Sequence, residues 1–158
     1  MNYELKTVSF IHIDRVLVTA KILHRCGKDM AEKKNLHHWD NSLCKTIAVV
    51  CLELLKNKVF LVYDDNAIGT FGIRKVEDGM YFEKLAILPE CSGKGIGSWC
   101  IQQIEQMGKE QECLYVTMAV YDKSEHAKEF YRNRGYVFCG ERKTRKHTEL
   151  VMRKDLTK

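Results

Sequence analysis

Several features are scarce or absent in this sequence, and each absence excludes a class of protein. The 158 residues include one proline, no low-complexity tract and no internal repeat, so one domain over residues 1–158 is expected. The first residues, Met1–Glu4, lack the basic-then-apolar pattern of a secretory signal peptide. No run reaches the roughly 18 consecutive apolar residues that a membrane span requires. A cytoplasmic protein with no membrane partner is therefore expected.

Features of metal and nucleic-acid proteins are also missing. The seven cysteines form no Cys-x-x-Cys pair and do not alternate with histidines at metal-ligand spacing, so no metal site is expected. They are predicted to be reduced thiols, and most have apolar neighbours, as Cys51, Cys100 and Cys113 do. The net charge of +5 suits an anionic cofactor but falls short of the basic footprint of a nucleic-acid binder, so no nucleic-acid partner is expected. The densest basic run, Arg142–His147, is predicted to be a solvated loop between two strands.

The hydrophobic patterns that are present alternate between strand and helix periods. Alternating and all-apolar runs predict strands at 3–10, 59–63, 67–76, 80–88, 114–120, 136–140 and 150–153. Helical spacing predicts helices over 13–23, 43–54, 96–107 and 124–134. The second to fourth strands follow one another through tight turns and end at Pro89, which predicts an antiparallel meander. This order of elements predicts an α/β (α+β) fold, a mixed sheet with helices on its faces.

The same patterns also give one prediction of burial and one of assembly. In the first helix, Ile13, Val16, Leu17, Ala20 and Leu23 recur at helical spacing. The strand at 114–120 is nearly all apolar, which predicts burial on both faces. An exposed edge strand near the C-terminus is compatible with a homodimer.

Three glycines at alternate positions lie between the fourth predicted strand and the third predicted helix, within Ser92–Ser98. A helix N-terminus carries unpaired amides and about half a positive charge, so it attracts phosphate. Glycines let the backbone approach an anion and adopt positive φ, which points successive N–H groups at one anion. The segment matches neither a P-loop nor a dinucleotide fingerprint. It is therefore predicted to bind a different pyrophosphate-bearing cofactor, the alternative being a flexible loop without a ligand.

Two motifs together resemble those of the GCN5-related N-acetyltransferases. Leu85–Gly97 looks like the acetyl-CoA signature of that family, whose Gln/Arg-x-x-Gly-x-Gly/Ala pattern falls on Ser92, Gly95 and Gly97. Downstream, Phe130–Tyr136 resembles the second motif of the family, an aromatic pair followed by glycine and another aromatic residue. The resemblance implies a GNAT-like mixed, mostly antiparallel central sheet with helices on both faces.

The resemblance also implies acetyl-CoA as co-substrate. The pantetheine arm would lie along the strand before the turn and the pyrophosphate on the turn itself, which makes the expected cofactor-binding residues Leu85, Ala86, Ile87, Ser92, Gly93, Lys94, Gly95, Ile96, Gly97, Ser98 and Ser124. The chain departs from the family at Ser92, where Gln or Arg is usual, and at Ser124, where Asn often contacts CoA. The affinity for the cofactor should therefore depend mainly on backbone groups.

Acetyl transfer to an amine needs a neutral amine, a stabilised oxyanion and a protonated leaving thiolate. In similar enzymes the tyrosine of the second motif donates a proton to the CoA sulfur, which makes Tyr131 the expected catalytic acid; a phenol with a pKa near 10 stays protonated at neutral pH. An aromatic core residue is the alternative for Tyr131. Glu83 is the candidate base, because it lies on an apolar strand with Tyr81, Leu85 and Ile87, where its pKa would be raised. A solvated glutamate, with water deprotonating the amine, is the alternative.

The acceptor is expected to be the primary amine of a small molecule or a protein. In similar folds the segment that joins the first two helices helps to shape the acceptor site, so Trp39 in that segment is expected to contact the acceptor, as is Tyr81. The competing function is a non-catalytic acyl-CoA binding or sensing module on the same fold. A dinucleotide-binding oxidoreductase is a weaker alternative.

Overall fold

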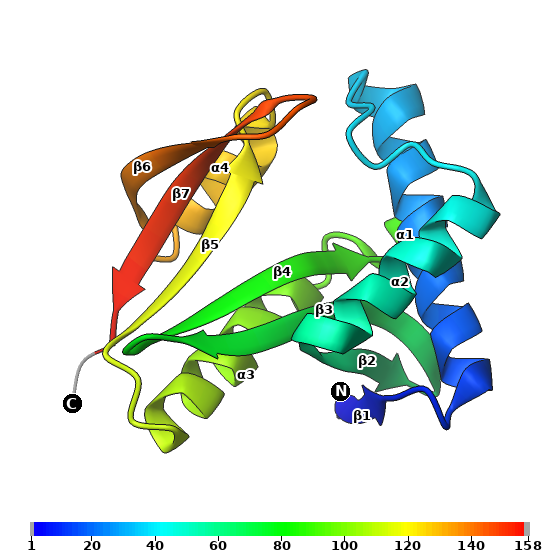
Figure 1. Ribbon diagram of the computed structural model, residues 1–158, viewed down its shortest axis with the longest axis horizontal. Coiled ribbons are helices and arrows are strands. Elements are labelled where there is room, and N and C mark those ends of the chain that lie inside the picture. The colour runs from blue at the N-terminus through cyan, green and yellow to red at the C-terminus, as the bar shows by residue number, and fades with distance from the viewer. Residues whose placement is uncertain (1, 157–158) are drawn as a thin grey trace. The chain divides into compact units, whose positions relative to one another are not determined.

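The strands and helices of the computed structural model, which describes residues 2–156, follow one another in the order that the hydrophobic periods predict (Figure 1). In chain order the elements are β1 (Glu4–Val8), α1 (Ile13–Lys34), α2 (Leu43–Lys56), β2 (Lys58–Asp64), β3 (Asn66–Val76), β4 (Gly79–Ile87), the short 3-10 turn η1 (Pro89–Cys91), α3 (Ile96–Glu110), β5 (Tyr115–Tyr121), α4 (Glu125–Arg132), β6 (Val137–Lys143) and β7 (Thr148–Asp155).

The strands form one seven-stranded sheet in the order β1-β2-β3-β4-β5-β7-β6. The pairs β1–β2, β2–β3, β5–β7 and β6–β7 are antiparallel. The pair β4–β5 is parallel, and its register joins Gly79–Tyr81 to Tyr115–Thr117. The predicted mixed, mostly antiparallel sheet is therefore confirmed.

The chain divides into two compact units that are not consecutive in sequence. The first unit contains the residues up to Arg74 together with 84–100, and the second contains 75–83 together with the residues from Ile101 onward. The chain passes from the first unit to the second within β3, returns to the first within β4 and passes to the second again within α3.

The core of the first unit lies between α1, α2 and the strands β1, β2 and β4. Its buried cluster includes Ala20 and Leu23 of α1, Val50 of α2 and Leu61 of β2. All residues from Val59 to Val62 are buried, and since neighbouring side chains of a strand point to opposite faces, this part of the sheet is covered on both faces.

The buried face of α1 includes only part of the apolar pattern that predicted the helix. Within that pattern, Ile13 and Leu17 are 69% and 41% exposed. The helix continues beyond the predicted range, to Lys34, and buries Thr19, Cys26 and Gly27 alongside Val16, Ala20, Ile22 and Leu23. Small and polar residues such as Thr19 and Gly27 lie on the buried face, although a pattern of apolar residues does not include them.

The second unit contains the hairpin of β6 and β7, the strand β5 and the helix α4. Along β5, Val116, Met118 and Val120 are buried while the alternating residues stay half-exposed, so the prediction of burial on both faces is wrong. The half-exposed face carries the Tyr115 ring, which lies 3.8 Å beneath the Arg153 guanidinium. The strand β6 ends the sheet order, and each of its residues is exposed.

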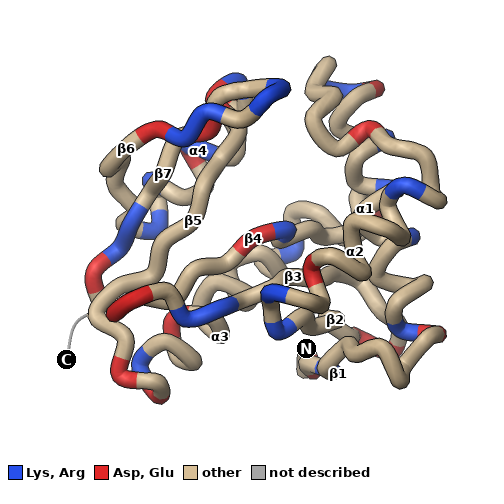
Figure 2. Tube along the Cα trace, viewed as in Figure 1, with Lys and Arg blue, Asp and Glu red and all other residues tan. Residues whose placement is uncertain are grey.

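The basic run near the C-terminus is only partly a loop. Arg142 and Lys143 belong to β6, and the hairpin turn is closed by the Thr144 N–H, which donates to the His147 carbonyl at 2.9 Å. Lys and Arg gather at this end of the β6–β7 hairpin (Figure 2).

Two further features concern membranes and metals. No helix within residues 2–156 is long and apolar enough to cross a membrane. The same residues contain no group of three or more His, Cys, Asp or Glu side chains that could hold a metal ion.

Candidate functional site

The glycine turn before α3 has the conformation that a phosphate cradle requires. Gly93 and Gly95 have φ values of +77° and +80°, whereas Gly97 belongs to the first turn of α3 and is not in the left-handed region. The predicted positive φ is therefore confirmed for two of the three glycines. A Cβ built on Gly93 or on Gly95 would meet no heavy atom within 4 Å, so the space over the backbone is open.

The N-terminus of α3 is anchored beneath this turn. Ile96 and Cys100 are buried, and the Trp99 ring packs edge-to-face on Tyr3 with centroids 5.4 Å apart. The Trp99 N–H donates to the Gly95 carbonyl at 3.0 Å, so the amides of residues 96–98 precede this first helical hydrogen bond. They are the groups that a helix offers to an anion.

The backbone N–H of Ser92 already has a hydrogen-bond acceptor within the protein. Its N–H donates to the Pro89 carbonyl at 3.2 Å and closes η1. On the same short turn, Glu90 pairs with Arg25 of α1 at 3.1 Å. Within the segment Ser92–Ser98, the groups expected to reach phosphate are therefore those after Ser92.

The strand before the turn contains a left-handed residue with a side chain. Lys84 has a φ of +57°, and side-chain alternation requires extended backbone at every residue. The predicted shared face of Glu83, Leu85 and Ile87 is consequently interrupted at Lys84. The sequence did not predict the positive φ at Lys84, because lysine rarely adopts this conformation.

The backbone at the end of β4 is held by α1 and β3. The Leu88 N–H donates to the Ile68 carbonyl at 2.8 Å, and the Cys26 thiol donates to the Ile87 carbonyl at 3.3 Å. Burial raises the pKa of Cys26 to about 12, with smaller contributions from Asp29 and Glu90, so the thiol keeps its proton. One carbonyl of the segment expected to hold the pantetheine arm therefore already has a protein donor.

In the second unit, Tyr131 belongs to an aromatic cluster. Its half-buried ring lies 5.9 Å from those of Phe82 and Tyr136 and 5.1 Å from that of Phe130. These contacts account for the aromatic residues of the second motif as packing. They also fix the plane of the Tyr131 ring, which a positioned proton donor requires.

Tyr136 is the buried member of that cluster. Its hydroxyl donates to Glu105 Oε1 at 3.2 Å, and the same oxygen accepts from Lys154 Nζ at 2.9 Å. Burial, with the Glu105 carboxylate as the next cause, raises the pKa of Tyr136 far above its usual range. The sequence did not predict this network, because Glu105 and Tyr136 are 31 positions apart and no spacing rule links them.

Tyr81 and Ser124 of the second unit have protein partners. Tyr81 is 8% exposed, and its hydroxyl accepts from Arg142 Nη2 at 3.3 Å. Arg142 in turn pairs with Glu149 at 2.8 Å. Ser124 is buried at the start of α4, where its Oγ lies 3.3 Å from Nδ1 of His126. Arg142 was predicted to be part of a solvated loop, so its place in this network is a correction.

Trp39 lies in the first unit, in the loop between α1 and α2. Its half-buried side chain packs against the core of that unit. A Cβ on Gly27 of α1 would clash with the Trp39 carbonyl, so only glycine allows the helix to approach the loop this closely. The predicted site residues are therefore divided: Trp39, 85–87 and 92–98 belong to the first unit, and Tyr81, Glu83, Ser124 and Tyr131 to the second.

The turn, left-handed at Gly93 and Gly95 and directly before α3, has the backbone form expected of the acetyltransferase signature that the first motif resembles. The model of the Acetyltransferase (GNAT) family matches residues 27–136, and the chain belongs to this family. No curated protein matches the chain in sequence.

Solved structures share the fold over almost the whole chain. A GCN5-related N-acetyltransferase from Rhodopseudomonas palustris has a TM-score of 0.77 at 18% identity, covering 99% of this chain and 97% of the other. The ribosomal-protein-S18-alanine N-acetyltransferase of Escherichia coli gives 0.74 at 11% identity, with coverage of 99% and 96%. The PaiA N-acetyltransferase of Thermoplasma acidophilum, solved with coenzyme A, gives 0.73 at 16% identity, with coverage of 98% and 99%. These likenesses establish the fold.

Proposed function

We propose that this chain transfers an acetyl group from acetyl-CoA to a primary amine, by direct attack of the amine within a ternary complex. The observation that carries the proposal is the turn at Gly93 and Gly95, left-handed at both residues, open above the backbone and directly before α3. Membership of the GNAT family and the PaiA structure solved with coenzyme A support acetyl-CoA as the ligand.

The cofactor residues have distinct parts in this proposal. The amides from Gly93 to Ser98 would bind the pyrophosphate, with Lys94 beside them as a positive charge. The backbone of Leu85–Ile87 would bind the pantetheine arm, and Ser124 would add one hydroxyl contact. Because Ser92 and Ser124 have short side chains, backbone groups would supply most of the affinity.

The proposed base and acid, Glu83 and Tyr131, belong to the second unit. When bound, acetyl-CoA supplies an activated thioester. Glu83, directly or through water, would accept the proton that the attacking amine loses as its nitrogen bonds to the acetyl carbon. Tyr131 would donate its phenolic proton to the sulfur as the carbon–sulfur bond breaks, and would regain a proton from solvent. Trp39 and Tyr81 would contact the acceptor.

The acceptor, the oligomeric state and the location belong to the same proposal. The S18-alanine N-acetyltransferase is named for a protein amine, and a small-molecule amine is equally compatible with this chain. A homodimer would use the exposed edge strand β6. We place the reaction in the cytoplasm, with no nucleic-acid or membrane partner.

The test is release of free CoA across a panel of amines that contains a polyamine, an amino acid, an aminoglycoside and a peptide N-terminus. Free CoA is separated by chromatography before detection, because the exposed thiols of Cys44 and Cys139 would add to a colour reaction. We expect turnover on at least one amine, reduced by about 10²-fold or more in Tyr131→Phe with the acetyl-CoA Kd unchanged.

Tyr63→Phe is the matched control, since the Tyr63 ring packs beneath Lys6 of β1 and belongs to the other unit. Acetyl-CoA binding without turnover on any amine would contradict catalysis and support the acyl-CoA sensing module. Turnover that Tyr131→Phe leaves intact would remove the proposed acid.

A further inference from the structure

The left-handed kink at Lys84 lies directly before the segment proposed to hold the pantetheine arm. A residue with a Cβ pays a penalty at a φ of +57°, and glycine would avoid it. The chain nevertheless has a lysine there. Interactions around Lys84 must therefore stabilise the kink.

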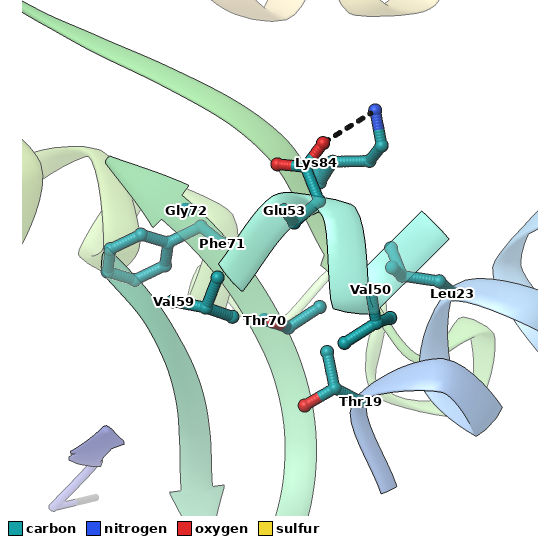
Figure 3. A pocket seen from close by; sticks show the side chains of 9 residues that line it. All are labelled: Thr19, Leu23, Val50, Glu53, Val59, Thr70, Phe71, Gly72 and Lys84. Carbon is teal, nitrogen blue, oxygen red and sulfur yellow. Dashed lines mark ion pairs between the residues drawn. The ribbon is translucent and has the colours of Figure 1, made fainter. Parts of the chain in front are cut away.

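The Lys84 side chain reaches a buried carboxylate on α2. Lys84 Nζ lies 3.6 Å from Oε1 of Glu53, a residue that is only 5% exposed. The two charged groups face each other over a pocket that apolar residues of α1, α2, β2 and β3 line, with about 220 Å³ of empty space that includes open solvent (Figure 3). A buried carboxylate needs paired charge and hydrogen bonds, and Lys84 supplies part of that charge to Glu53.

Glu53 is itself held in place by its neighbours. Asn57 Nδ2 donates to Glu53 Oε2 at 2.5 Å, and Lys56 Nζ lies 3.5 Å from Oε1. Asn57 also accepts from Arg74 Nη1 at 2.9 Å. A Cβ on Gly72 would lie 3.3 Å from Asn57, so Asn57 packs closely on β3. The carboxylate is therefore a fixed anchor for Lys84.

We propose that Glu53 is a positioning residue that, through its ion pair with Lys84, holds the left-handed kink in β4 and so sets the backbone of Leu85–Ile87 to receive the pantetheine arm. This inference rests on the proposed function for its ligand, but its geometry concerns only residues of the first unit. It assigns a role in cofactor affinity to a helix-α2 side chain that lies outside both motifs.

The variants Glu53→Gln and Lys84→Met remove the charge pair and keep a side chain at position 84. Releasing a left-handed residue of this type corresponds to roughly a fivefold to thirtyfold change in an equilibrium. We expect both variants to bind acetyl-CoA about fivefold or more weakly by calorimetry, with kcat at saturating cofactor close to that of the parent. Hydrogen exchange at the amides of residues 85–87 should become faster.

Lys84→Gly separates the kink from the charge. Glycine adopts positive φ without the penalty, so Lys84→Gly should bind acetyl-CoA almost as the parent does, and Glu53→Gln combined with Lys84→Gly should regain most of the lost affinity. A merely structural role for Glu53 would not be rescued by a change at position 84.

Three results would overturn the proposal. These are unchanged affinity and exchange in Glu53→Gln and Lys84→Met, a loss that Lys84→Gly shares with Lys84→Met, or a loss in Glu53→Gln that Lys84→Gly does not rescue. If Glu53→Gln fails to fold, the difference in acetyl-CoA affinity between Lys84→Met and Lys84→Gly still tests the proposal. If the parent chain binds no acetyl-CoA, the proposed function fails, and hydrogen exchange at residues 85–87 still tests the kink.

Discussion

At the scale of single residues, one carboxylate oxygen in the second unit accepts two hydrogen bonds from separate segments of the chain. Glu105 Oε1 accepts from the Tyr136 hydroxyl and from Lys154 Nζ, and the Tyr136 ring lies against Tyr131. This partly buried network therefore connects α3 and β7 to the aromatic cluster that contains the proposed acid. The network holds the Tyr136 ring, and Tyr136 in turn packs against Tyr131. A proton donor needs a fixed ring, so the network contributes to the position of Tyr131 as well as to stability.

Tyr136→Phe tests the strength of this network. The change leaves the ring packing intact and removes a hydrogen bond to a charged acceptor, so we expect a loss of about 1–2 kcal/mol in the free energy of unfolding. Urea denaturation measures it, with Tyr63→Phe as the control for loss of a half-exposed hydroxyl. A Tyr136→Phe variant as stable as the parent would show that Glu105 is satisfied by Lys154 alone.

Two buried thiols make stability depend on alkaline pH. Burial raises the pKa of both Cys26 and Cys100 from 9.0 to about 12. Since the folded state keeps protons that the unfolded chain loses, stability is complete below pH 9 and falls as pH rises from 9 towards 12. Two such groups give a slope of up to about 2.7 kcal/mol per pH unit.

Urea denaturation at pH 8 and pH 9.5 measures this slope below the ordinary pKa of tyrosine, so that the shifted Tyr136 contributes little. Cys100→Ala should reduce it by about half, because one of the two shifted groups is removed. Cys139→Ser should leave it unchanged, because Cys139 is exposed. A free energy of unfolding that is equal at the two pH values would contradict the assignment.

At the scale of elements, the turn into α3 combines open space with backbone strain. Alanine at Gly93 or Gly95 would meet no neighbour, so its only cost in the free protein is the left-handed conformation, about 1 kcal/mol. We expect Gly93→Ala and Gly95→Ala to lose a few °C in Tm and to bind acetyl-CoA at least tenfold more weakly, because the amides would turn from the pyrophosphate.

Gly135 provides the matched control for this prediction. It has a φ of +92° after α4, in the second unit, and a Cβ there would lie 3.4 Å from the Lys154 side chain. Gly135→Ala should therefore lose a similar or greater amount of stability and keep the acetyl-CoA affinity. Equal losses of affinity in all three variants would mean that general destabilisation, and not the turn, explains the effect.

The elements themselves were largely predictable, because each depends on local periodicity and turn residues. The meander that ends at Pro89 and the glycine turn both follow from neighbours in sequence. The exposure of Ile13 and Leu17 could not be predicted, because burial on α1 depends on which face α2 and the strands cover. The kink at Lys84 depends on a partner 31 positions away, Glu53, and no local rule describes such a pair.

At the scale of the whole molecule, the interleaved units explain why the site could be predicted only in pieces. Of the residues proposed to bind the cofactor, 85–87 and 92–98 belong to the first unit, whereas Ser124 belongs to the second, as do Glu83 and Tyr131. Each of the two motifs could be recognised in the sequence, because each lies within one continuous stretch of chain. The supporting residues Glu53, Glu105 and Arg142 come from other stretches, and only the fold identifies their partners.

Ligand-linked stability tests the cofactor on the whole molecule. Acetyl-CoA at about 100 times its Kd should raise the free energy of unfolding by about 2.7 kcal/mol, which corresponds to roughly 5–10 °C in Tm for a chain of this size. NAD at the same concentration should give no shift, because the turn lacks the dinucleotide fingerprint. The net charge of +5 adds long-range attraction for the phosphates, which salt screens, so 0.5 M NaCl should reduce the acetyl-CoA shift without abolishing the contribution of the backbone amides. Equal stabilisation by NAD and acetyl-CoA would contradict the CoA assignment and favour a general anion site at α3.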